Sequence, residues 1–434
     1  MSALPLFPRH DGRQTVYADA QRKLDRDTFL GMARALAAQL PEQTHCLNLC
    51  DDRLPFMLSF CAALLRRKCT LLPLNRTEAA LAELAAIHPG IIALCDSPQT
   101  HAGIGQMDVR NWMTAAPPAG RDENIPADMP SAELYTSGST GAPQPHRKTW
   151  AMLVQGARVL ADELNPGGTL LGSVPSQHMF GLESTILLPM QSGLALAGGC
   201  PLLPQDIQSA MQSISTPIWW ATTPLHLRAC VESGLGFPRL AGMLCATQTL
   251  APELARAAED CFQAPLHEIY GCTEAGAIGL RRPAQSETWR LLPDWEMESD
   301  GETARISGNR CEGRLALPDH IEIADARHFR LLGRHASLIK VGGKRMHLDA
   351  LNRILQSLPG VKDGVFYQPS EGTRLTALVV ADDPDPAALM AALRQRIDPV
   401  FLPRPIHWVP ALPRNAVGKL PMQTLQELVD TLSR

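Results

Sequence analysis

The feature that most constrains the fold is an alternation of strand-like and helix-like segments along the first hundred residues. Cys46–Leu49 and Thr70–Leu74 are short apolar runs of the kind that form buried strands. Leu54–Leu65 and Thr77–Ile87 have the length and the apolar spacing of helices. Parallel strands are joined by crossovers that are usually helical, so this alternation predicts an α/β fold with layers and parallel strands.

The rest of the chain divides into parts of different character. A helix around Phe29–Leu40 is expected near the N-terminus, with Asp27 or Thr28 as its cap, whereas Ser97–Met129 predicts an irregular connection. Strands and helices then alternate to about residue 280, and residues 281–334 are β-rich. We therefore expect an N-terminal core over 1–334, made of layered α/β subdomains and a β-rich subdomain. A small, mobile α+β domain is expected over 335–434.

Composition excludes several classes of protein. The 434 residues are 45% hydrophobic and 19% charged, which is ordinary for a globular protein. A net charge of -4 disfavours a general nucleic-acid binder. The eleven cysteines are scattered without a CxxC pair, so we expect reduced thiols rather than disulfides or zinc. The N-terminus lacks a signal pattern and the apolar runs are short or interrupted, which predicts a soluble, cytoplasmic protein without stable membrane insertion.

A run of small and hydroxylated residues follows an apolar segment at Tyr135. Its glycines allow backbone N–H groups to approach an anion closely, and its hydroxyls are further donors, so the run suits a phosphate. It is not a Walker loop, because no Gly-Lys-Ser/Thr closes it. By itself, such a run more often forms an exposed loop. The candidate phosphate-binding residues are Thr136, Ser137, Gly138, Ser139, Thr140 and Gly141.

Further polar patches follow this loop in a characteristic order. They are Val174–Gly181 with its histidine, Tyr270–Glu274, Gly333–Arg334 with Leu338–Lys344 behind it, and Leu412–Lys419. Together with the loop, their order and intervals resemble the adenylate-forming superfamily of acyl- and aryl-CoA synthetases, peptide-synthetase adenylation domains and luciferases. The chain looks like a compact, stand-alone AMP-dependent ligase of this superfamily.

Two details strengthen the resemblance. The interval from Asp319 to Arg334 equals the family's interval between its ribose-binding Asp and the following Gly-Arg. Cys245–Leu254 stands where the family usually has Ser-Gly-Gly-Ala-Pro-Leu-Ser-Pro-Glu-Leu. The resemblance implies that a carboxylate attacks the α-phosphate of ATP to give an acyl-adenylate, and that a thiol then displaces AMP. It therefore implies an AMP-forming acid–thiol ligase that uses ATP, Mg²⁺ and either CoA or the phosphopantetheine of an acyl carrier protein.

The resemblance also assigns roles to individual residues. It implies catalytic roles for Lys419, Glu274 and His178, and Mg²⁺ ligation by Glu274 with Thr140. It implies that the nucleotide is bound by the loop and by Thr247, Gln248, Tyr270, Gly271, Thr273, Asp319 and Arg334. It implies a pantetheine channel at Gly342 and Gly343 and a hinge at Ala336. Outside this context Glu274 and Lys419 would be solvated charges, Asp319 and Arg334 members of surface ion pairs, and His178 a core histidine.

The carboxylic acid is constrained by one residue in particular. Met179 stands where peptide-synthetase domains commonly have an Asp for the α-ammonium group, so an amino-acid substrate is disfavoured. The other pocket candidates are mostly apolar and fit an aryl or medium-length acyl group, although the tryptophan pair fits the core equally well. These candidates are Trp219, Trp220, Thr222, Thr223, Cys272, Ala277 and Ile278.

Two departures from the family pattern leave alternatives open. Gln144 replaces the usual loop lysine, for which Arg147 or Lys148 could substitute, and Ala336 replaces the usual Asp or Lys of the hinge. The alternatives are an adenylate-forming enzyme with a non-thiol acceptor and a degenerate nucleotide-binding module without turnover. A nicotinamide-dependent dehydrogenase is disfavoured, because no GxGxxG follows a predicted strand.

Overall fold

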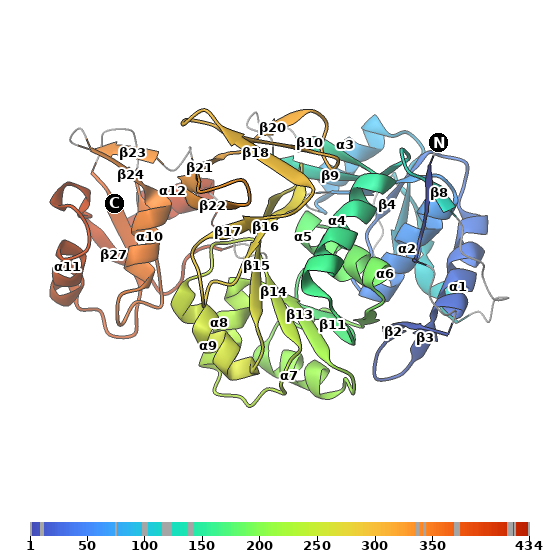
Figure 1. Cartoon of the computed structure of the whole chain (residues 1–434), viewed down its shortest axis with the longest axis horizontal. Coiled ribbons are helices and arrows are strands. Elements are labelled where there is room, and N and C mark those ends of the chain that lie inside the picture. The colour runs from blue at the N-terminus through green and yellow to red at the C-terminus, as the bar shows by residue number, and fades with distance from the viewer. Residues whose placement is uncertain are drawn as a thin grey trace.

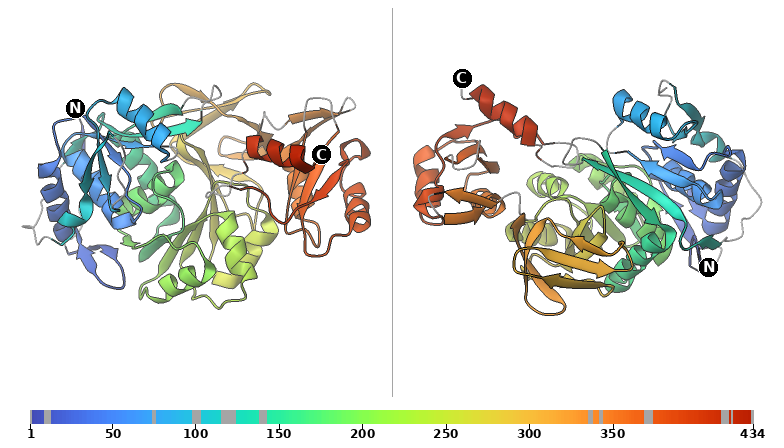
Figure 2. Two further views of the ribbon diagram at one scale, coloured as in Figure 1. Left: turned by 180° about the vertical axis from the view of Figure 1, so that it is seen from behind. Right: turned by 90° about the horizontal axis from the view of Figure 1, so that it is seen from above.

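The chain is elongated, with an N-terminal sheet at one end and the C-terminal residues in a separate lobe at the other (Figure 1). The views from behind and from above also show the C-terminal residues as a distinct lobe at one end of the molecule (Figure 2). The computed structural model describes residues 2–8, 13–73, 76–97, 103–114, 124–137, 143–334, 338–341, 344–368, 374–414, 420 and 422–432.

The predicted phosphate loop begins in a six-stranded sheet of order β10-β9-β5-β4-β6-β7. Its strands run parallel except β10, which returns antiparallel to β9. Helix α2, Arg53–Leu65, is buried on all sides because it packs against this sheet and against a second one. Helices α1 and α3 are Arg26–Gln39 and Glu78–Ile87. The strands are β4 His45–Asn48, β5 Cys69–Leu72, β6 Ile92–Cys95, β7 Gly105–Asp108, β9 Pro130–Ser137 and β10 Pro143–Thr149.

The second sheet has eleven strands in the order β21-β22-β17-β16-β15-β14-β13-β11-β12-β2-β3. Strands β2, β12, β11, β13, β14 and β15 are parallel to one another, and antiparallel strands extend the sheet beyond β2 and beyond β15. The strands are β2 Thr15–Ala18, β3 Lys23–Asp25, β11 Thr169–Gly172, β12 Ala195–Ala197, β13 Ile218–Thr222, β14 Gly242–Cys245, β15 Leu266–Cys272, β16 Gly276–Arg281, β17 Trp289–Leu291, β21 Asp319–Ile323 and β22 His328–Arg334.

Helices and small sheets complete the N-terminal part. A π-helical stretch, Leu182–Leu187, joins α5 to α6. The helices are α4 Trp150–Leu164, α5 Met179–Gly181, α6 Leu188–Ser192, α7 Pro204–Gln212, α8 Pro224–Glu232 and α9 Pro252–Phe262. The remaining strands are β1 Ala3–Pro5, paired with β8 Asn124–Pro126, and β18 Trp295–Ser299, β19 Ala304–Gly308 and β20 Arg314–Ala316.

The C-terminal lobe has hydrophobic clusters of its own, and its helix α10 contacts β22. Its elements are β23 Leu338–Val341, β24 Lys344–His347, α10 Leu348–Gln356, β25 Asp363–Tyr367, β26 Thr376–Val380, α11 Pro386–Arg394, β27 Ile406–Trp408 and α12 Met422–Leu432. Within the described part of the chain, no helix combines the length and the apolar character needed to cross a membrane.

The predicted α/β architecture with a large N-terminal and a small C-terminal part is confirmed, with local corrections. The cap of α1 is Asp25, whose carboxylate accepts from the Thr28 backbone, because the helix begins earlier than predicted. The expected irregular connection contains β7, a 3₁₀ turn at Val109–Trp112 and β8. The eleven cysteines, all within the described residues, have free thiols as predicted. The boundary at 334/335 adjoins residues outside the described ranges and stays a prediction.

Candidate active site

Two sheets meet where the phosphate loop leaves β9. Thr136 Oγ1 lies 2.8 Å from His146 Nε2, on the facing strand β10. The same nitrogen lies 3.5 Å from the Glu274 carboxylate, in the turn between β15 and β16. One imidazole therefore joins the first hydroxyl of the predicted phosphate loop to the predicted Mg²⁺ ligand.

Lys148 contacts the main chain of the same glutamate, Glu274. Its ammonium donates a hydrogen bond to the backbone carbonyl of Glu274, and only 3% of the residue is exposed. Burial lowers the pKa of Lys148, and Cys272, Glu183 and Glu274 partly offset this shift by favouring the charged form. Strand β10 thus contacts both the side chain and the main chain of Glu274.

Strand alternation separates the two cations that the sequence offered as substitutes for a loop lysine. Thr136 is paired with Gln144 across the hairpin, so Gln144, His146 and Lys148 share one face of β10. Arg147 lies on the other face, where it forms a 2.9 Å ion pair with the buried Glu133. Within the described residues, Lys148 rather than Arg147 lies on the face toward Glu274.

The predicted ribose-binding residues form a second part of the site. Tyr270 donates its hydroxyl hydrogen to Asp319 Oδ2 over 2.7 Å, and its ring packs against Trp289 and Phe329. Asp319 is paired with Arg334 across the β21–β22 hairpin, which explains the spacing seen in the sequence. Gly271 has no room for a side chain, because a Cβ there would lie 2.3 Å from the Gly276 carbonyl oxygen.

The predicted adenine segment carries backbone strain. Thr247 has a φ of 82°, a left-handed conformation that a β-branched residue rarely adopts. It stands where the family has the second glycine of its motif, which explains why the backbone takes this path. The segment beyond it is anchored, since the Leu250 N–H donates to Glu268 Oε1 at 2.8 Å. Both Thr247 and Gln248 follow the carboxyl end of β14, at the edge of the parallel sheet where ligands bind in such folds.

His178 lies at the start of α5 and is half-buried rather than a core residue. The neighbouring Met179 lies against the β15–β16 hairpin, since a Cβ on Gly276 would come within 3.3 Å of Met179 Cε. The segment before it is held by Arg53, which donates to Val174 O at 2.9 Å and to Ser176 Oγ at 3.2 Å. The tryptophan pair belongs to the core, because both rings are buried in the clusters on either side of the sheet.

Sequence reasoning missed the buried charges that support the site. Glu183, in the π-helical stretch, accepts from the Ala277 N–H and faces Arg310, which is bound in turn by Asp294. Burial raises the pKa of Glu183. Glu183 stands as a lone charge within an apolar run, and Arg53 directly precedes one. That pattern is the signal in the sequence that could have found them.

Several predicted residues cannot be placed. The side chains of Ser137 and Arg334 lie outside the described residues, although both backbones are described. Entirely outside the described residues are Gly138, Ser139, Thr140, Gly141, Ala336, Gly342, Gly343 and Lys419.

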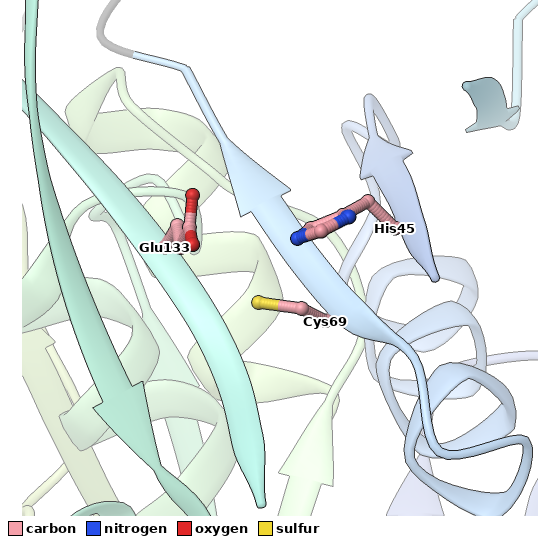
Figure 3. Close-up of side chains that lie close together, drawn as sticks. All are labelled: His45, Cys69 and Glu133. Atoms are coloured by element: carbon pink, nitrogen blue, oxygen red, sulfur yellow. The ribbon is translucent and has the colours of Figure 1, made fainter. Parts of the chain in front are cut away.

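A separate cluster lies on the opposite face of the six-stranded sheet. Figure 3 shows His45, Cys69 and Glu133 pointing toward one another from β4, β5 and β9, with ligand atoms within 4.8 Å of each other. These atoms are already engaged: Glu133 accepts from Arg147 and Tyr135, and His45 Nδ1 contacts Thr44 at 2.8 Å. Burial raises the pKa of the Cys69 thiol, so it stays protonated. The cluster is satisfied by its own packing and hydrogen bonds.

Comparisons with known proteins agree with the geometry. The AMP-binding enzyme family matches residues 32–308, and the AMP-binding enzyme C-terminal domain matches residues 351–419. A 4-coumarate–CoA ligase from Halorhodospira halophila is 32% identical over 300 residues, which cover 66% of this chain and 73% of the relative.

Solved structures show the same fold. MatB from Rhodopseudomonas palustris with ATP bound has a TM-score of 0.85 and 18% identity, over 99% of this chain and 98% of that one. The o-succinylbenzoate–CoA synthetase from Bacillus subtilis, in complex with ATP and magnesium, has a TM-score of 0.79 and 18% identity, over 94% of this chain and 96% of that one. The predicted adenylate-forming family is thereby confirmed: this chain belongs to the AMP-binding enzyme family.

Proposed function

We propose that this protein uses ATP to activate an aryl carboxylic acid as its adenylate and transfers the acyl group to the thiol of CoA. The observation that carries the proposal is the contact of one imidazole, His146, with both Thr136 and Glu274. It brings Thr136, the first residue of the predicted phosphate loop, close to the predicted metal ligand, and a bound triphosphate needs the loop and the metal ligand side by side. The chain's relationship to 4-coumarate–CoA ligase supports an aryl acid and CoA.

The chemistry consists of two displacements. A carboxylate oxygen of the acid attacks the α-phosphorus of ATP, the bond to the bridging oxygen breaks, and pyrophosphate leaves. The thiol then attacks the acyl carbonyl and loses its proton to solvent, and AMP leaves with the electrons of the broken acyl–oxygen bond. Phosphoryl transfer depends mainly on positioning and on stabilisation of charge. In this chain Thr136 would contact phosphate, and Asp319, held by Tyr270, would accept from the ribose hydroxyls.

The residues present fit a magnesium ion. Glu274 provides a carboxylate, the hard oxygen ligand that Mg²⁺ prefers, and 37% of its side chain is exposed to an incoming ligand. When bound there, the ion would neutralise charge on the phosphates. Glu274 would hold it, and the Thr140 hydroxyl is proposed as a second ligand.

Lys419 is proposed to stabilise the charge that develops on the reacting carboxylate and phosphate. Pyrophosphate release should be measured across aromatic and fatty acids, each with CoA and with a holo acyl carrier protein. We expect release with aryl acids and thioester formation with CoA, and loss of release in Lys419→Ala with ATP binding retained. Lys362→Ala is the matched control, since that lysine is exposed and pairs with Asp382.

The same experiment separates the alternatives. Pyrophosphate release that is independent of any thiol would point to a non-thiol acceptor. Faster release with the carrier protein than with CoA would identify the carrier protein as the acceptor. ATP binding without release for any acid would indicate a module without turnover. Adenylation by Lys419→Ala at the wild-type rate would refute the role of that lysine.

A further inference from the structure

We propose that His146 and Lys148 are positioning residues that fix Glu274 for the metal–triphosphate complex and that replace the lysine missing from the phosphate loop at position 144. This inference rests on the proposed function. It concerns the three residues of β10 that share one face with Thr136. It adds His146 to the site and selects Lys148 from the two cations, Arg147 and Lys148, that the sequence pattern left open.

The first step is the geometry of β10. Gln144 is the cross-strand partner of Thr136, and its exposed side chain carries no charge. The next two side chains on that face are His146 and Lys148, and both reach Glu274. The strand therefore places two nitrogen-bearing side chains along the face that leads from Thr136 to the β15–β16 turn.

The second step is what these contacts do to Glu274. A carboxylate at a turn between two strands can adopt several side-chain conformations, and ordering it costs free energy when a ligand binds. Lys148 fixes the backbone of this residue through the carbonyl oxygen. His146 lies against the carboxylate and, at 2.8 Å from Thr136, is held in place itself. Partners of this kind orient metal ligands before the metal arrives.

The third step is the cost of burying Lys148. An ammonium group removed from water is unfavourable unless it is hydrogen-bonded and compensated by charge. Here the ammonium donates a hydrogen bond to the Glu274 carbonyl, and Cys272, Glu183 and Glu274 favour its charged form. A methionine of similar length would fill the space without that cost, so the charge contributes something that packing does not require. The hydrogen bond from the Lys148 ammonium to the Glu274 carbonyl accounts for this contribution.

The test measures nucleotide binding to the full chain by isothermal titration calorimetry, so it does not depend on turnover. ATP is titrated at a series of Mg²⁺ concentrations, and AMP is titrated without Mg²⁺. The variants are His146→Ala, His146→Gln and Lys148→Met. The matched control is Arg147→Lys, on the same strand but the opposite face, which keeps the charge opposite Glu133.

We expect His146→Ala and Lys148→Met to raise the Mg²⁺ concentration for half-maximal ATP binding by about tenfold or more. AMP affinity should stay within about twofold, since AMP lacks the β- and γ-phosphates. His146→Gln should recover part of the loss, because its amide can contact both Thr136 and Glu274. Arg147→Lys should resemble the wild type.

Two results would overturn the inference while leaving the proposed function intact. One is an unchanged Mg²⁺ requirement in both His146→Ala and Lys148→Met. The other is an equal loss of AMP and ATP affinity, which would indicate general damage to the fold rather than mispositioning of Glu274. A wild-type protein that binds neither AMP nor ATP would contradict the proposed function, and the inference would fall with it.

Discussion

Tyr270 donates its hydroxyl hydrogen to Asp319 over 2.7 Å, which links β15 of the parallel region to β21 at the edge of the same sheet. The ring of Tyr270 packs against both Trp289 and Phe329, so the donor has little freedom to turn away. The carboxylate proposed to bind ribose is therefore oriented by a residue of the same motif that carries Glu274.

Tyr270→Phe should weaken AMP binding about tenfold without abolishing it. A hydrogen bond to a charged group contributes about 1.5–3 kcal/mol, and the variant leaves Asp319 without this donor. Tyr17→Phe is a matched control, because Tyr17 also donates to a carboxylate, that of Asp19, over 2.7 Å but far along the chain from the site. Calorimetry with AMP gives the answer, and equal affinities for all three proteins would refute this role of Tyr270.

The sequence predicted the parts of the site that depend on local spacing. The interval between Asp319 and Arg334 is the length of one β-hairpin, and the two residues face each other across it. Gly271 and Glu274 likewise belong to a single tight hairpin. Such relationships recur at fixed intervals, so a motif preserves them even when the rest of the sequence diverges.

The contacts of Glu274 could not be predicted in the same way. They depend on the register of β9 with β10, which decides whether His146 or Arg147 faces the site, and a shift of one residue exchanges the two faces. They depend also on how the two sheets meet, which no local pattern specifies. The sequence does not single out the strand Asp319–Ile323 either, because three of its five side chains are polar and only Ile321 is buried.

Thr247→Gly should stabilise the fold by about 1 kcal/mol. The left-handed conformation costs a β-branched residue about 1–3 kcal/mol, whereas glycine adopts it freely but loses about 0.5–1 kcal/mol in unfolded-state entropy. Asn165→Gly is the control, because asparagine tolerates its φ of 43° and the gain should be smaller. Urea unfolding measures both, and a destabilised Thr247→Gly would mean that the threonine side chain makes contacts worth more than the strain.

Arg281→Ala should destabilise the protein by about 3–5 kcal/mol, since it leaves the buried Glu268 without its partner at 2.6 Å. Burial raises the pKa of Glu268, so the unpaired carboxyl would take up a proton more readily. The neighbouring Arg282 pairs with Glu259 at 2.8 Å but is more exposed, and Arg282→Ala should cost about 1 kcal/mol or less.

Because Glu268 anchors Leu250, Arg281→Ala should also weaken AMP binding, whereas Arg282→Ala should not. Urea unfolding and AMP titration together check both statements. Equal losses of unfolding free energy in the two variants would show that breaking the buried Arg281–Glu268 pair costs no more than breaking the more exposed Arg282–Glu259 pair.

The last prediction concerns acid sensitivity and the buried His226. Burial lowers the pKa of His226 below its ordinary value of 6.5, so the folded state keeps the ring neutral. Well above pH 6.5 the ring is neutral in both states and this contribution to stability is complete. As the pH falls below 6.5, the unfolded state binds the proton first, and stability is lost until the lower folded pKa is reached. His226→Gln should therefore show a shallower loss of unfolding free energy between pH 6.5 and 5 than the wild type. Parallel slopes for wild type and His226→Gln would show that the ring is protonated alike in the folded and unfolded states.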